Sequence, residues 1–167
     1  MALGLTDNVL EYPLGSPHKK IYTTNEQLNE WMNSFVSEAE EDNVWVSVEM
    51  VETPEFRDEV EFEKMLQLSM DTAKANCIET TLPKNRFVKV RCRDVQHQIL
   101  IKISYSCENQ RIRYFDKDLA KVQRIVERVG GYMGLQLDKD VGVIKIAIPH
   151  EVTSLDPEQG RMKGEQE

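Results

Sequence analysis

The sequence predicts an α+β fold, in which helices cover one face of a mixed, mostly antiparallel sheet. Apolar residues recur at helical spacing in three segments, and they alternate with polar residues in five other segments. The last four alternating segments form two pairs, each joined by a short polar turn, which is typical of β-hairpins. Helices between hairpins pack on one side of the sheet that the hairpins form, so we expect a two-layer sandwich with three helices on one face.

The first helix is expected to begin near Thr23 or Thr24, because either side chain can cap a helix N-terminus. Apolar residues recur at helical spacing over residues 28–39, and an acidic run follows them. Acidic residues oppose the dipole at a helix C-terminus, so the helix should end near Asn43. Residues 44–51, VWVSVEMV, then alternate as a half-buried strand does.

A second helix is expected to begin near Glu61, because apolar residues lie along one side of the segment that follows it. Residues 86–95 and 99–106 alternate cleanly between apolar and polar positions. A few polar residues join these two runs, which predicts an antiparallel hairpin that turns at His97 and Gln98.

A third helix is expected to begin near Asp116 and to end at Gly130-Gly131, because glycine is a strong C-terminal stop. Ile125 lies on its apolar side and should be buried against the sheet. Residues 132–138 and 141–149 then form the last hairpin.

The chain has 167 residues and a formal net charge of −8, which suits one acidic globular domain. We expect an N-terminal arm or linker over 1–20, the folded domain over 21–150 and a disordered polar tail over 151–167. An acidic surface repels phosphate backbones and anionic lipid, so neither nucleic acid nor a membrane is an expected partner. The three cysteines and three histidines are widely spaced, which argues against a disulfide framework and a zinc site. We expect the cysteines to act as small buried apolar residues.

Three strings carry a resemblance to a known family. Residues 66–75 read LQLSMDTAKA, residues 119–131 read LAKVQRIVERVGG, and residues 143–149 read VIKIAIP. They resemble, in the same order, a helix L-x-N-x-L-D-N-A-I-E-A, a helix K-K-I-V-E-K-Y-G-G and a closing strand of the ATP-binding domain of bacterial sensor histidine kinases. The closest similarity is to the peptide-sensing and citrate-sensing branch, and the fold is the one shared with gyrase, Hsp90 and MutL. The resemblance covers about residues 25–150.

The departures from this family fall on its nucleotide site. The resemblance implies an Asn that places Mg²⁺ at the position of Thr72, while Asp71 beside it matches the family. It implies an adenine-reading Asn or Asp in the stretch 103–107, which reads ISYSC here. It also implies a glycine-containing lid, whose backbone N–H groups approach the phosphates. No glycine occurs in the stretch 107–118, and Asp118 stands where the last lid glycine should be.

Five residues remain as candidate nucleotide contacts. Asp71 and Thr72 are candidates for a residual phosphate site, with Thr72 as the metal ligand, or they lie on the rim of a helix that packs on the sheet. Arg111 and Arg113 are candidates for pairing with phosphate oxygens, or they balance nearby acidic residues. Tyr105 is a candidate for stacking on a base, or it fills the former pocket.

These departures favour a degenerate ATP-binding domain that acts as a regulatory or protein-binding module in bacterial signal transduction. We expect no catalytic residue, no cofactor and no activity of the chain alone. Its partner would be a protein, of the dimerisation-helix or response-regulator type. The chain itself would be cytoplasmic, by itself or as the cytoplasmic part of a membrane receptor. His18 lies in a Pro-containing segment that is too short for a phosphoacceptor helix.

Two alternatives stay open. One is a divergent but working histidine kinase domain, which holds ATP and Mg²⁺ with Thr72 and the arginines. The other is a small-ligand sensor that reuses the emptied pocket.

Overall fold

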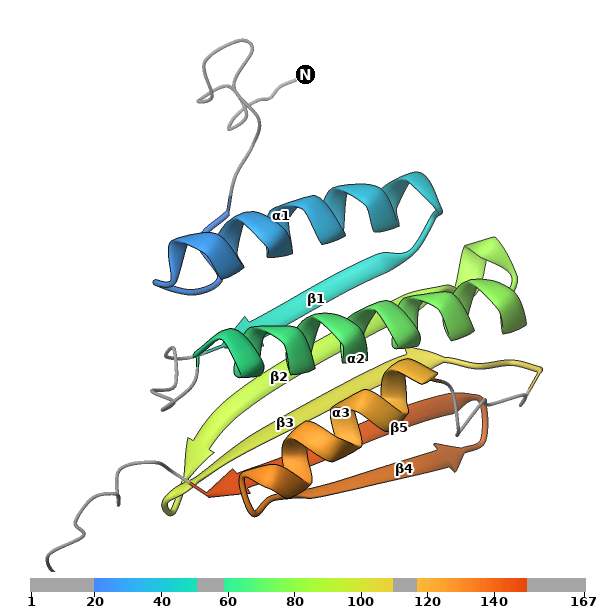
Figure 1. Ribbon diagram of the computed structural model, residues 1–167. Helices are drawn as coiled ribbons and strands as arrows, with labels where there is room; N and C mark the ends of the chain where they lie inside the picture. The colour runs from blue at the N-terminus through green and yellow to red at the C-terminus, as the bar shows by residue number, and fades with distance from the viewer. Residues whose placement is uncertain (1–19, 51–58, 110–116, 150–167) are drawn as a thin grey trace, which may run out of the picture.

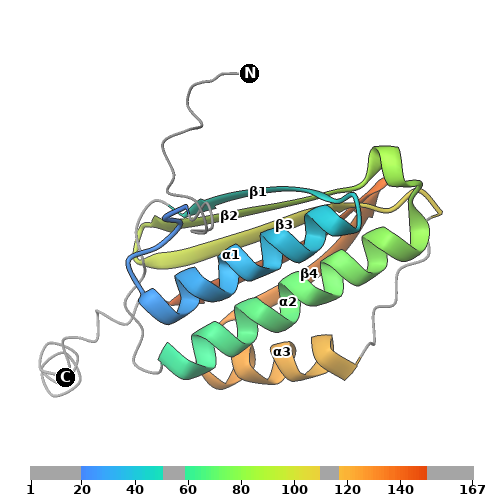
Figure 2. The same cartoon turned by 90° about the horizontal axis from the view of Figure 1, so that it is seen from above.

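The computed structural model describes residues 20–50, 59–109 and 117–149 as two layers, three helices on a five-stranded sheet (Figure 1). The helices are α1 (Glu26–Glu41), α2 (Glu59–Thr80) and α3 (Lys117–Arg128), with one 3₁₀ turn, η2 (Pro83–Asn85). The strands are β1 (Trp45–Met50), β2 (Phe87–Val95), β3 (Gln98–Ser106), β4 (Tyr132–Asp138) and β5 (Val141–Pro149). All three helices lie on the same face of the sheet (Figure 2), so the expected α+β sandwich is confirmed.

The sheet has the strand order β1-β2-β3-β5-β4. β1 runs parallel to β2, and every other neighbouring pair is antiparallel. The parallel pair follows from the chain path, because α2 carries the chain back along the helical face before β2 begins. The expectation of a mixed, mostly antiparallel sheet is therefore confirmed.

The turn between β2 and β3 lies one residue earlier than the sequence suggested. Val95 pairs with Gln98, so Gln96 and His97 form a two-residue loop, with φ of 45° and 65°. Positive φ at both central residues gives the turn a twist that matches the flanking strands. This geometric gain outweighs the preference of these two side chains for negative φ, which is why the local sequence pointed to the wrong pair.

The N-terminus of α1 is capped by Asn25 and not by either threonine. The Asn25 side chain accepts a hydrogen bond of 2.8 Å from the backbone N–H of Leu28. Thr23 instead holds the capping residue, because its hydroxyl accepts a hydrogen bond of 3.3 Å from the N–H of Asn25. Asparagine is at least as good a cap as threonine, and here it satisfies the otherwise free N–H of Leu28.

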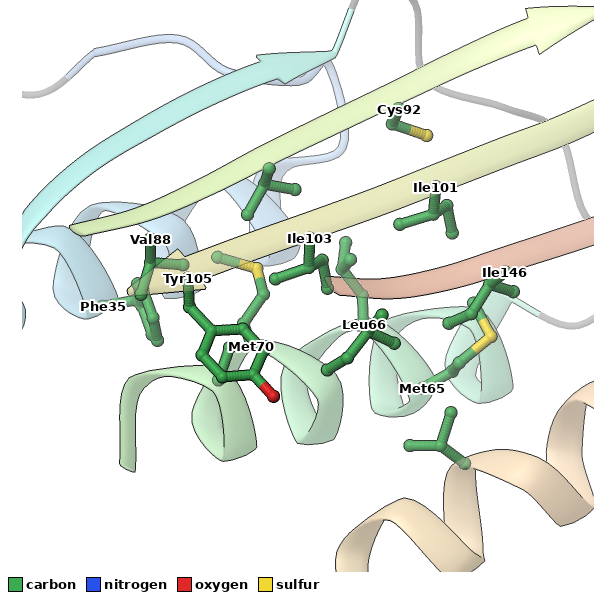
Figure 3. Packing of buried hydrophobic residues seen from close by; sticks show 14 of the residues in the cluster. Phe35, Met65, Leu66, Met70, Val88, Cys92, Ile101, Ile103, Tyr105 and Ile146 are labelled. Carbon is green, nitrogen blue, oxygen red and sulfur yellow. The ribbon is translucent and has the colours of Figure 1, made fainter. Parts of the chain in front are cut away.

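The core lies between the sheet and the helices (Figure 3). Ile101, Ile103 and Ile146 on the central strands are buried against Met65 and Leu66 of α2. Each such side chain contributes about 1.5–3 kcal/mol by leaving water.

Two expectations from the sequence are confirmed in this core. Ile125 is 5% exposed, as its place on the third helix predicted. Cys77, Cys92 and Cys107 are buried free thiols. Burial, together with the nearby charge of Asp94, raises the pKa of Cys92 to about 12, so this thiol is not nucleophilic at neutral pH.

α2 and α3 pack side by side and run in opposite directions. An ion pair of 2.7 Å joins Arg128, at the end of α3, to Glu61, near the start of α2. Since the two helices are antiparallel, the start of α3 lies beside the C-terminal half of α2. No helix in the described ranges is long and apolar enough to cross a bilayer.

Candidate functional site

The candidate site lies along the side of α2 that faces the first turn of α3. Thr72 and Asn76 are four residues apart, so their side chains share one side of the helix. Glu61 lies on the same side about three turns earlier and pairs with α3, which fixes the direction in which that side faces. Both Thr72 and Asn76 are only 4% exposed.

Thr72 and Asn76 carry the two polar atoms in this part of the molecule that lack partners. Within the described ranges, Thr72 Oγ1 and Asn76 Oδ1 are buried and make no hydrogen bond. The amide nitrogen of Asn76 donates to the backbone oxygen of Thr72 at 3.0 Å, which orients Oδ1 away from that carbonyl. A buried polar atom without a partner destabilises a fold by about 1–3 kcal/mol, so two on adjacent turns need an explanation.

Other hydroxyl groups on α2 are satisfied, which makes these two atoms distinct. Ser69 donates to the carbonyl of Met65 at 2.8 Å, and Thr80 donates to the carbonyl of Asn76 at 2.8 Å. The orphaned oxygens are hard, neutral ligands of the kind that Mg²⁺ accepts. They supply no charge, however, and the described ranges hold no group of three or more His, Cys, Asp or Glu that could bind a metal. They therefore fit a supporting role beside a phosphate-bound cation and do not form a complete metal cage.

Asp71 lies on the outer rim of this site. Its side chain is exposed, and helical geometry turns it about 100° away from Thr72. Partial burial raises the pKa of the Asp71 carboxyl above its usual value; Lys74 lowers it, and Glu38 and Asp118 raise it. Because the side chain is exposed, water screens this carboxylate. Asp71 is therefore well placed to affect a neighbouring charge and poorly placed to bind the same ion as Thr72.

The end of β3 closes the other side of the site. Tyr105 is 3% exposed, and its ring points from β3 toward α2 (Figure 3). The ring packs against the backbone of Gly142 on β5, where any Cβ atom would overlap it. The next two residues, Ser106 and Cys107, are buried as well. The side chains at this strand end thus fill space inside the domain.

Hydrogen bonds tie the end of β3 to the C-terminal end of α2. Ser106 Oγ lies 3.1 Å from Cys77 Sγ and accepts a hydrogen bond of 3.1 Å from the N–H of Phe87. The N–H of Glu108 donates to Thr81 Oγ1 at 3.1 Å. We call these five residues the polar seam.

The loop before β2 is held in the same way. The carboxylate of Glu108 accepts hydrogen bonds from the N–H of Leu82, at 3.1 Å, and from the side chain of Asn85, at 2.7 Å. Arg86 donates to the carbonyls of Thr81 and Ile78, at 2.9 Å and 3.1 Å, and so satisfies the end of α2. The strand end and the helix end are therefore one bonded unit.

The structure brings some of the proposed site residues together and separates others. Thr72 is inside the gap between α2 and α3, Asp71 is on its rim, and Tyr105 is within the core at the strand end. Arg111 and Arg113 lie outside the described residues. The sequence reading missed the role of Asn76, although its spacing of four residues from Thr72 was a usable signal.

It also missed the other groups that hold the site together. Arg86, Ser106 and Glu108 act through contacts with residues distant in sequence. Local patterning gives no sign of such contacts.

No protein-family model matches this sequence, and no curated protein matches it. Solved structures match its fold. The catalytic domain of histidine kinase ThkA, in a nucleotide-free form, is 19% identical, with a TM-score of 0.58 over 80% of this chain and 98% of that one. The histidine kinase AdeS of Acinetobacter baumannii is 17% identical, with a TM-score of 0.56 over 75% of this chain and 62% of that one.

The histidine kinase domain of the blue-light activated kinase of Erythrobacter litoralis EL346 is 14% identical, with a TM-score of 0.55 over 75% of this chain and 60% of that one. The chain thus spans about three fifths of the AdeS and Erythrobacter chains. At these identities the similarity establishes the fold, which is that of histidine kinase catalytic domains.

Proposed function

We propose that this chain uses a histidine-kinase-type ATP-binding fold as a regulatory or protein-binding module in bacterial signal transduction, and that its nucleotide site is reduced. One observation carries the proposal. At the end of β3, where the resemblance implies an adenine reader, Tyr105, Ser106 and Cys107 are all at most 3% exposed. A residue that reads a base must present a free polar atom to it, and the polar seam uses Ser106 internally.

The first turn of α3 supports the same proposal. A helix N-terminus attracts anions such as a nucleotide phosphate. Here the first turn already contains an acidic residue, Asp118. Its carboxylate repels a triphosphate, and it also raises the pKa of Asp71 across the gap. This repulsion weakens phosphate binding at this end of the site.

A second candidate function is a working Mg²⁺–nucleotide site, and the orphaned oxygens favour it. A bound cation would give Thr72 Oγ1 and Asn76 Oδ1 the partner that they lack in the described ranges. When bound, Mg²⁺ offsets the charge of the nucleotide phosphates. Thr72 and Asn76 would help to hold it, and Arg111 and Arg113 remain proposed phosphate contacts.

Calorimetric titration of the full chain with Mg²⁺·ATP and Mg²⁺·ADP separates the two candidates. We expect no binding up to about 100 μM and no ATP hydrolysis, since losing two polar contacts of about 1–3 kcal/mol each reduces a micromolar site to roughly millimolar. A dissociation constant near or below about 100 μM would overturn the proposal. This conclusion requires that binding is lost in Thr72→Ala and kept in the control variant Ser69→Ala. The control removes a hydroxyl on the same helix that already has a hydrogen bond to its own backbone.

On this proposal the partner is a protein of the signalling pathway, of the dimerisation-helix or response-regulator type. The chain would act in the cytoplasm, by itself or as the cytoplasmic part of a receptor. A domain that keeps its fold and does not turn over nucleotide acts through the surfaces with which it binds other proteins.

A further inference from the structure

The open face of the sheet is basic, although the chain as a whole carries a formal net charge of −8. Along β2, β3 and β5, alternate side chains point away from the helices, and most of them are exposed, although Val143 on β5 is buried. Five of these side chains are cationic: Lys89, Arg91, Arg93, Lys102 and Lys145. The described strand residues add only two carboxylates to this face, Glu49 on β1 and Asp138 at the far end of β4.

Three of the cations form a row across the sheet. Arg91 is directly opposite Lys102, and Lys102 is directly opposite Lys145. Like charges at directly opposite positions destabilise a sheet. Arg91 has a partner in Glu49, at 3.0 Å, but neither Lys102 nor Lys145 makes an ion pair with any described residue. The row Arg91–Lys102–Lys145 is therefore only partly neutralised within the described molecule.

The first helix, on the other face of the sheet, has the opposite charge. α1 has the sequence EQLNEWMNSFVSEAEE, with five glutamates and no lysine or arginine. This separation opposes a two-fold dimer formed through the open faces, because each basic row would meet another. It also opposes a nucleic acid strand, whose charge at every phosphate would be repelled by the acidic remainder of the chain.

Large apolar side chains border the basic row. Trp45 on β1 is 60% exposed and Tyr132 on β4 is 66% exposed. A depression of about 610 Å³ lies on the β1 side of the row, and its lining includes Trp45, Phe87, Lys89, Arg91 and Lys102 together with Glu49. Exposed aromatic residues beside arginine are the usual composition of the strongest contacts in protein–protein interfaces.

We propose that the open face docks an acidic helix of a partner protein, with its carboxylates on the row Arg91–Lys102–Lys145. Neighbouring strands are about 4.7–4.9 Å apart, and residues at i and i+4 of a helix have Cβ atoms about 5–6 Å apart. A helix that lies across the strands can therefore place one carboxylate near each cation. Trp45 lies four residues from the level of the row on β1, and Tyr132 lies two residues from it on β4. Apolar residues of a helix that crosses the sheet obliquely would contact one or the other. The proposal rests on the protein-binding role proposed above and names its surface, on the face of the sheet opposite Thr72.

The arrangement of the aromatic residues favours a helix over single-stranded RNA. Sites for single strands interleave basic groups with aromatic rings, so that each base stacks while its phosphate is neutralised. Here the rings of Trp45 and Tyr132 lie on the two edge strands, and the cations lie on the strands between them. RNA binding is accordingly the competing outcome of the test.

The test measures binding of a fluorescein-labelled acidic peptide to the full chain by anisotropy. The probe is a helical peptide of about 18 residues of Ala, Glu and Leu, with glutamates at i, i+4 and i+7 on one face. We expect binding that weakens at least about tenfold in the double variant Lys102→Glu with Lys145→Glu, and that weakens as salt is raised.

The matched control is Lys121→Glu with Arg124→Glu, on the exposed side of α3. Each double variant replaces two cations by two anions, so both change the formal net charge from −8 to −12. The control variant should bind the peptide about as tightly as the parent chain.

Four outcomes would overturn the proposal. The first two are no binding of the acidic peptide at about 1 mM and an equal loss of peptide affinity in both double variants. The third is equal affinity for a peptide of the same composition with its glutamates spread around the helix. The fourth is tighter binding of an oligouridine probe that is weakened as much by Lys102→Glu with Lys145→Glu. Circular dichroism confirms that each variant is folded. The nucleotide titration is independent of this test, so failure of the reduced-site proposal and failure of the docking proposal give different results.

Discussion

The two faces of the sheet are built from the same strands and obey different constraints. Along β3, Ile101 and Ile103 are buried against the helices, whereas Leu100 and Lys102, which alternate with them, are exposed. The covered face contains the core, the candidate site and the polar seam. The open face holds a row of like charges. Stability is therefore concentrated on the covered face, and the open face can carry an unfavourable charge pattern at small cost.

The largest expected effect is on the covered face. Ile125→Ala removes a side chain that is 5% exposed and should lower the free energy of unfolding by about 2–5 kcal/mol, through lost burial and the cavity left behind. Urea denaturation measures it. The control is Arg124→Ala, one residue earlier and exposed, with an expected change within about 0.5 kcal/mol. Equal midpoints for the two variants would show that the buried side of α3 is misassigned.

A pair of glycine substitutions compares the faces directly. Gly142→Ala places a methyl group against the buried ring of Tyr105 and should destabilise the domain by about 1–3 kcal/mol. Gly134→Ala on the open face meets the hydroxyl end of Tyr132 at 2.9 Å, but that side chain is exposed and can move aside. Thermal unfolding should therefore show a clear shift only for Gly142→Ala. A similar shift for both would mean that the open face is as tightly packed as the covered one.

The next effect has the opposite sign. Thr72→Val keeps the shape of the side chain and removes the unpartnered hydroxyl, so it should raise the free energy of unfolding by about 1–2 kcal/mol in the absence of nucleotide. The matched control is Thr80→Val, which loses a hydrogen bond to the carbonyl of Asn76 and should be destabilising. If Thr72→Val also destabilises, Oγ1 has a partner in solution, and bound water or a cation at the site becomes the better account.

The smallest effect belongs to the open face. Lys102→Glu converts two repulsive cross-strand pairs, with Arg91 and with Lys145, into attractive ones. We expect a gain of about 0.2–1 kcal/mol in unfolding free energy, which salt should reduce. Lys121→Glu, on α3, serves as the comparison. A loss of stability in Lys102→Glu would indicate that the lysine has a structural role and would weaken the argument for a docking surface.

The sequence predicted the layers and the helix and strand segments because these depend on local periodicity. The apolar spacing around Ile125 identifies its helix, and the alternation of residues 99–106 identifies its strand. The pairing of β1 with β2 depends on where α2 returns the chain, which no local pattern encodes. The turn at Gln96 and His97 was misplaced by one residue, because the chain has no Asn-Gly or Asp-Gly pair there to mark a two-residue turn.

The candidate site was predictable only in part. The resemblance identified Thr72 from its place in the helix string, and helical spacing would have added Asn76. The closure of the strand end could not be anticipated, because Ser106 contacts Cys77, 29 residues away, and Glu108 contacts Asn85, 23 residues away. That Thr72 Oγ1 lacks a partner is likewise a property of the packed helices and not of the sequence around it.

The single parallel strand pair has a consequence for the order of folding. Trp45 pairs with Phe87, 42 positions along the chain, whereas Val95 and Gln98 in the hairpin are three positions apart. Closing a long loop costs more chain entropy than closing a short one, and distant pairings slow folding. The hairpins should therefore form first, and α1 with β1 should join the sheet last. The same unit should be the first to open in the native state, so its amides should exchange with solvent faster than those of β3 and β5.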